Sequence, residues 1–157
     1  KKVSLKNLLK VWGLSYVGNF LGCVVLSLIF TASGAARQTM TAYYRVILPG
    51  KMSASTTELF LRGILCNFLV CLAVWLGMSA NDVPGRMLGL FFPIMCFVVI
   101  GYEHCIANMF FIPLGMLLGA PVSAAELFAG NLVPATLGNI VGGGLFVGGL
   151  YWYLNRK

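Results

Sequence analysis

Long apolar runs separated by short polar stretches make up most of this chain. Three of these runs lie at positions 11–36, 62–79 and 134–154. A helix needs about 20 predominantly apolar residues to cross a hydrocarbon core, so each run predicts one membrane-crossing helix, with 62–79 near the short limit. Tryptophan and tyrosine near the outer ends of the first and last runs are typical of a membrane–water interface.

A fourth run, Phe91 to Leu118, is interrupted by polar residues at its middle. At ~1.5 Å per residue it is too long for one crossing and too short for two. We therefore predict a broken helix, with two half-helices that meet near Phe97 to Gly101 and with His104 at the start of the second. Ionisable groups at membrane depth usually face a water-filled path or a ligand.

The stretch between the first two runs is mixed in polarity. It predicts a short amphipathic helix from Arg37 to about Leu48, a turn at Pro49-Gly50, and a helix cap at Ser55 or Thr56. After the broken segment, positions 119–131 are expected to form a loop with one helical turn around Glu126.

Glycines four residues apart occur in the first and last runs. Small residues at this spacing let two helix backbones approach closely, so they predict helix packing. The pairs are Gly18/Gly22, Gly138/Gly142 and Gly144/Gly148.

Composition places the chain in the membrane class: 59% of its residues are hydrophobic, 10% are charged, and mean hydropathy is +0.90. The net charge of +7 comes from basic residues at segment ends and in loops, which favours anionic lipid and a small anion over nucleic acid as partners. The five cysteines lie in apolar segments without a C-x-x-C pair, so no disulfide, metal or cofactor is expected.

Four crossings place both basic termini on one side, which the positive-inside rule assigns to the cytoplasm. The loop between Arg37 and Arg62 is also basic and would lie outside. A basic loop on the outside is explained if Lys51 and its neighbours form an electropositive vestibule that concentrates an anion.

The candidate chemistry centres on His104, the only histidine of the chain. Its ordinary pKa, about 6.5, lets it exchange a proton near neutral pH; bracing of the helix break is the alternative role. Glu103 is expected to cap the second half-helix or accept from its backbone amides, and Asn108 lies one turn beyond His104. Asn67 suits either donation to an anion or a bridge between helices.

Three ordered motifs are spread over most of the chain: GILCNFLVCLAVW at 63–75, GYEHCIANMF at 101–110 and NLVPATLGNIVGGG at 131–144. Together they resemble the motifs of the formate/nitrite transporter family of anion channels. The resemblance implies a homo-pentamer of aquaporin-like protomers, each with its own pore and six membrane segments in two inverted halves.

The resemblance also implies roles for particular residues. His104 resembles the central pore histidine and Asn67 the asparagine that accompanies it, while Lys51 matches a lysine that favours anions. Phe97 and Val70 match the apolar residues of the outer constriction. Asn131 and Asn139 are both candidates for the last-helix asparagine that lines the pore, with Gly101, Glu103 and Asn108 supporting the break.

The chain matches the third to sixth segments of that pattern and begins without methionine, so we expect a single transmembrane domain that is the C-terminal part of a longer channel. The predicted function is passage of formate or nitrite through a bacterial-type inner or plasma membrane, with His104 exchanging a proton. The alternatives are a related anion (hydrosulfide, lactate or acetate) or a non-conducting structural subunit. An enzyme is not expected, because no nucleophile, base and orienting acid converge.

Overall fold

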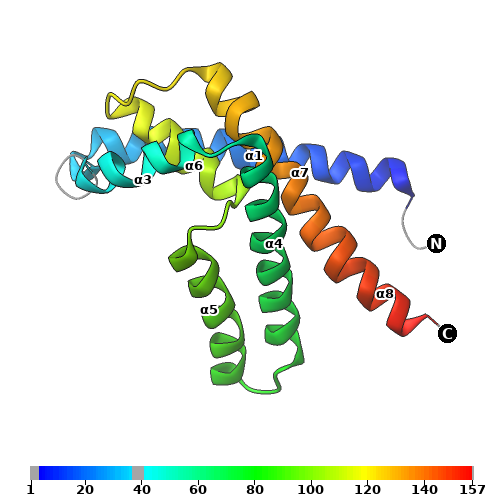
Figure 1. The fold of residues 1–157 in the computed structure, drawn as a ribbon. Coiled ribbons are helices and arrows are strands. Elements are labelled where there is room, and N and C mark those ends of the chain that lie inside the picture. The colour runs from blue at the N-terminus through cyan, green and yellow to red at the C-terminus, as the bar shows by residue number, and fades with distance from the viewer. Residues whose placement is uncertain (1–3, 37–40, 157) are drawn as a thin grey trace. The chain divides into compact units, whose positions relative to one another are not determined.

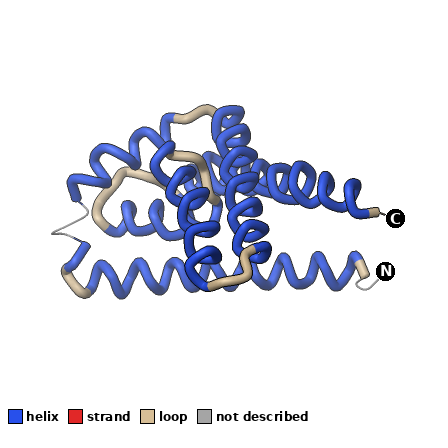
Figure 2. The backbone as a smooth tube through the Cα atoms, turned by 90° about the horizontal axis from the view of Figure 1, so that it is seen from below, coloured by secondary structure: helices blue, strands red, loops and turns tan. Residues whose placement is uncertain are grey.

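A computed structural model describes residues 4–36 and 41–156, and every regular element in these two ranges is a helix (Figure 2). Lys1, Lys2, Arg37 and Lys157 lie outside the described residues. The elements are α1 Leu5–Ala32, α3 Thr41–Ser53, α4 Thr56–Ser79, α5 Val83–Ile100, α6 Cys105–Leu117, η1 Glu126–Leu132, α7 Val133–Ile140, η2 Val141–Gly149 and α8 Leu150–Asn155. The two η elements are π-helices that continue into the neighbouring α-helices.

Four helical segments among the described residues are long and apolar enough to cross a membrane: α1, α4, α5 and the continuous stretch Glu126–Asn155. α1, α4 and Glu126–Asn155 correspond to predicted crossings. The fourth, α5, begins at Val83 rather than Phe91 and is long enough to cross by itself, so it is more than the predicted half-helix, while α6 is a shorter apolar helix. The first crossing helix begins at Leu5, earlier than predicted, because the Ser4 side chain accepts a hydrogen bond from the Asn7 amide and caps it there.

The chain divides into two compact units. The first unit contains α1, α3 and most of α6. There the Ser27 hydroxyl donates to the carbonyl of Cys23 on its own helix, at 2.8 Å, and lies 3.2 Å from the carbonyl of Phe110 on α6. Phe30 and Phe110 also contact through their rings. A polar group shared with a neighbouring helix is a usual way to join helices where water is absent.

The second unit contains α4, α5 and the helices that follow residue 127. In Figure 1, α4 and α5 run side by side as an antiparallel pair, joined by a short turn. The predicted cap at Ser55 is confirmed. Ser55 and Glu58 form a reciprocal capping box at the start of α4, in which the Ser55 hydroxyl accepts from the Glu58 amide and the Glu58 carboxylate accepts from the Ser55 amide.

Glycines bring α4 against α7 and η2. A Cβ atom added at Gly138 would overlap the Phe60 carbonyl oxygen, and one added at Gly142 would overlap the Ile64 carbonyl oxygen. Gly63, on the facing side of α4, is equally enclosed by the Ala135 carbonyl. The predicted packing role of Gly138/Gly142 is confirmed, and it sets the distance between the helices that carry the site.

The other two glycine pairs make no such contact within the described chain. A Cβ atom at Gly18, Gly22 or Gly144 would meet nothing within 4 Å, and one at Gly148 would approach only the carbonyl of Gly143 in its own segment. These faces of α1 and η2 are open to their surroundings.

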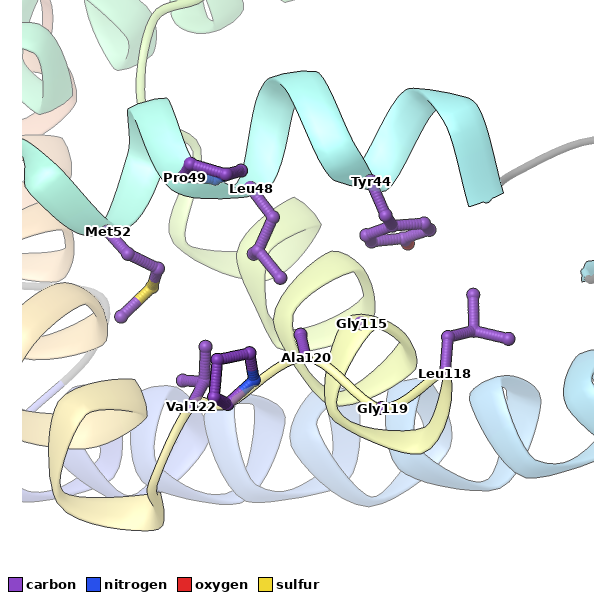
Figure 3. Close-up of a pocket in the computed structure, with 10 residues that line it drawn as sticks. Tyr44, Leu48, Pro49, Met52, Gly115, Leu118, Gly119, Ala120 and Val122 are labelled. Carbon is purple, nitrogen blue, oxygen red and sulfur yellow. The ribbon is translucent and has the colours of Figure 1, made fainter.

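The predicted turn at Pro49-Gly50 is wrong, because α3 continues through both residues to Ser53. A proline costs a helix one hydrogen bond, but its fixed φ is itself helical. Tyr44, Leu48 and Met52 are spaced by one helical turn and face the end of α6 (Figure 3). This packing holds the helix through the local breaker.

The predicted loop at 119–131 is also too long, since the chain is helical from just after Ser123, ahead of η1, rather than from near Pro134. Ser123 and Glu126 form a second capping box: the Glu126 carboxylate accepts from the Ser123 amide at 2.8 Å, and the Glu126 amide donates to the Ser123 hydroxyl at 3.2 Å. The Ser-x-x-Glu spacing in the sequence was the signal for this early start.

Candidate functional site

The predicted helix break lies in the second unit, between the end of α5 at Ile100 and the start of α6 at Cys105. Gly101 has φ +80°, its amide donates to the Val98 carbonyl, and the Tyr102 amide donates to the Phe97 carbonyl. This closing pattern, with glycine in the left-handed region, is a common way to end a helix. The break is therefore confirmed, a few residues later than predicted, and His104 immediately precedes α6.

The first amide of α6 is capped by a residue far away in the sequence. The Cys105 amide donates to Oδ1 of Asn139 on α7 at 2.9 Å, and this bond is buried. A helix leaves its first amides without partners inside the helix, and an amide oxygen can accept from one of them.

Asn139 binds two further main-chain groups. Its Nδ2 donates to the Gly63 carbonyl on α4 at 2.9 Å and to the Glu103 carbonyl in the break at 2.8 Å. The N/O assignment follows from the partners, because the two carbonyls can only accept and the Cys105 amide can only donate. One side chain thus joins α4, α7 and the break.

Asn67 lies beside this junction on α4. Its Nδ2 donates to the main-chain carbonyl of Asn139 at 2.6 Å, so it bridges two helices, which was one of its two predicted roles. Its side chain is half-buried. A Cβ atom at Gly143 would overlap the Asn67 amide nitrogen, so η2 is as closely packed here as glycine allows.

The His104 ring stacks on the ring of Phe97, with centroids 5.7 Å apart and planes 19° from parallel. Phe97 is 8% exposed, while His104 is half-buried. The break thus holds a half-buried imidazole against the face of an aromatic ring.

The second unit brings most of the predicted site residues together around the break. These are His104, Phe97, Asn67, Asn139, Gly101 and Glu103, with Glu103 buried. Val70 lies half-buried on α4, and Asn131 is fully buried in η1.

Two predicted residues belong to the first unit. Lys51 lies in the last turn of α3 and is half-buried, and Asn108 is fully buried on α6. Their roles beside an anion or beside His104 stay predictions.

The sequence did not single out Gly63 as part of the site. Its carbonyl accepts from Asn139, and its missing side chain admits α7. Gly63 and Asn67 are four residues apart and so share one face of α4, which was the available signal.

A separate cavity of about 510 Å³ lies in the first unit, between α3 and the end of α6 (Figure 3). Its described lining is apolar apart from Tyr44, with Leu48, Met52 and Pro121 among the contributing side chains. No cationic or amide side chain belongs to that described lining.

Comparison with known proteins gives one family. The model of the formate/nitrite transporter family matches residues 1–153. A probable formate transporter from Methanothermobacter thermautotrophicus is 43% identical over the whole chain, and the formate channel FocA of Haemophilus influenzae is 33% identical over 99% of it.

Solved structures agree with the sequence matches. A pentameric formate channel with formate bound is 36% identical, with a TM-score of 0.85 over 99% of this chain and 69% of its own. An ion channel of the same family gives 29% identity and a TM-score of 0.88 over 98% of this chain and 62% of its own. The fold is thus the aquaporin-like helical fold of these channels. The chain spans about three fifths of the two curated relatives, 63% and 62% of their lengths.

Proposed function

Because this chain belongs to the formate/nitrite transporter family, we propose that its protein passes small monovalent weak-acid anions across a membrane, formate first. Two matched relatives carry formate in their names, and a matched structure is described with formate bound. Nitrite is the second candidate, from the name of the family. The membrane is of the bacterial inner or plasma type, and the chain serves as the third to sixth segments of a six-segment protomer.

The observation that carries this proposal is the position of His104. It sits at the helix break, half-buried, against the face of Phe97. An anion that reaches this point has lost water, and a protonated imidazole at 4 Å returns roughly 4 kcal/mol at an effective dielectric constant of about 20. Transfer of the imidazole proton to the anion gives a neutral weak acid, which crosses the apolar stretch at lower cost.

The other predicted residues and the assembly fit the same function. Phe97 and Val70 form the apolar constriction that keeps water and inorganic ions from leaking. Lys51 attracts the anion before it reaches the constriction. The protein assembles as a homo-pentamer with a pore in each protomer, and the similarity to a pentameric formate channel supports this assembly.

The orientation is supported by the charges of the second unit. Where α4 and α8 end, the tilted rings of Trp75 and Tyr151 are in contact, with centroids 4.1 Å apart. The Arg156 guanidinium lies 4.5 Å from the centre of the Tyr153 ring. Arg86 lies at this end of the unit, whereas Arg62 at the other end faces Glu58 at 3.8 Å. The aromatic residues mark a membrane interface, and the basic residues favour its cytoplasmic side, so we place the C-terminus there.

The test is anion uptake by proteoliposomes that contain the full-length protein. His104→Phe keeps an aromatic ring against Phe97 but removes the imidazole that can take up and release a proton. Uptake of formate should therefore lose its pH dependence. Tyr102→Phe is the matched control, since it alters the neighbouring break residue without removing the imidazole, and its pH profile should follow the wild type. An unchanged profile for His104→Phe would exclude the histidine mechanism.

A further inference from the structure

Both hydrogens of the Asn139 amide group are engaged in the folded chain. One goes to the Gly63 carbonyl and the other to the Glu103 carbonyl, and Oδ1 accepts from the Cys105 amide. A side-chain amide has two donors and one oxygen. Asn139 therefore has no N–H left to offer an anion, and only 5% of its surface is exposed.

Asn67, unlike Asn139, does not use both of its side-chain N–H groups within the described residues. One of its two Nδ2 hydrogens goes to the Asn139 carbonyl, and no further hydrogen bond of its side chain is formed with the residues that the structure describes. The side chain is half-buried, and its second N–H is left for a partner outside the described residues. Its bond to Asn139 fixes the direction of the amide before any anion arrives, which reduces the entropy lost on binding.

Asn131, the other candidate on the last segment, is 0% exposed. A side chain without accessible surface does not touch an ion in a path. The burial of Asn131 and Asn139 argues against a direct contact of either side chain with an anion.

We propose that Asn139 is a positioning residue, which clamps the start of α6 and thereby His104, and that Asn67 is the side-chain amide that donates to the anion. The inference rests on the proposed function, because it assigns roles at the same site. Loss of Asn139 removes its bonds to the Glu103 carbonyl and the Cys105 amide, on either side of His104, so the imidazole is held less firmly against Phe97. Loss of Asn67 removes a contact to the anion and leaves the break intact.

Backbone hydrogen exchange of the full-length protein tests the clamp without reference to transport. Asn139→Ala should lower the protection of the Cys105 amide, because its bond to Asn139 Oδ1 is lost. Asn67→Ala is the matched control, and the protection at Cys105 should persist in it. Retained protection in Asn139→Ala would overturn the clamp even if the proposed transport is correct. Where Asn139→Ala does not assemble, Asn139→Leu, which is similar in size to asparagine and also lacks the acceptor, gives the same measurement.

Formate uptake in wild-type and His104→Phe backgrounds tests the division of roles. Asn67→Ala should raise the half-saturation concentration about tenfold in both backgrounds, since a hydrogen bond to a charged group is lost. Asn139→Ala should flatten the pH profile in the wild-type background and change nothing further in His104→Phe, because residues that act through one another are not additive.

The contrary outcomes are equally specific. If Asn139→Ala raises the half-saturation concentration tenfold in both backgrounds, Asn139 binds the anion directly, and the positioning role is overturned. An Asn139→Ala variant with a wild-type pH profile overturns it as well. If His104→Phe itself keeps the wild-type profile, the proposed function fails, and the exchange experiment still decides whether Asn139 clamps the break.

Discussion

Replacement of Gly138 by alanine tests whether close helix contact sets the site. The added Cβ atom would lie 3.0 Å from Gly63 Cα and 3.1 Å from the Ile64 amide nitrogen, and it would overlap the Phe60 carbonyl oxygen. These are backbone atoms of α4, which cannot rotate away as a side chain can. The contact is relieved only if α7 moves away from α4.

The size of this movement follows from the contact distances. Relief of the Gly63 contact alone, from 3.0 to the 3.4 Å of ordinary van der Waals contact, needs 0.4 Å, and the Phe60 oxygen needs more. Overpacking of this kind costs about 1–3 kcal/mol. A movement of that size also stretches the bonds from Asn139 to Gly63 and from Asn67 to Asn139, which are 2.9 and 2.6 Å long.

The assay is thermal unfolding of the full-length protein in detergent, followed by formate uptake. At roughly 2–4 °C per kcal/mol, Gly138→Ala should lower the apparent melting temperature by about 2–12 °C. Gly144→Ala is the matched control, because its Cβ atom meets nothing within 4 Å. Gly144→Ala should be as stable as the wild type or slightly more stable, since alanine favours helix by about 1 kcal/mol. Equal melting temperatures for Gly138→Ala and the wild type would refute the reasoning.

Two further predictions concern the ends of helices. Gly101→Ala should destabilise the protein by about 1–2 kcal/mol through its φ of +80° alone, because the new Cβ atom meets nothing within 4 Å; denaturation measures this, and no loss would contradict a left-handed residue at the break. Ser123→Ala should cost about 1 kcal/mol by removing a cap, with Ser123→Thr as the control that keeps the hydroxyl, and equal stability of the two variants would argue against the capping box.

The elements that were predicted well depend on local properties of the sequence. The broken segment was recognised because its length fits neither one crossing nor two, and the cap at Ser55 because Glu58 follows at the capping-box spacing. The errors occurred where local signals compete with packing. Pro49-Gly50 is a turn signal, yet Tyr44 and Leu48 pack toward α6 and keep the helix intact.

The sequence by itself determined the crossing helices, the interruption before α6 and the family, because hydrophobic length, glycine placement and ordered motifs are all written along the chain. Only the tertiary structure decided what the asparagines do. The partners of Asn139 are main-chain carbonyls 76 and 36 residues away, and any residue type offers the same carbonyl. The residue types in the sequence therefore do not reveal such bonds. Only when α4, α7 and the break are brought together does it appear that both N–H groups of the Asn139 side chain are bonded, whereas Asn67 uses one of its two.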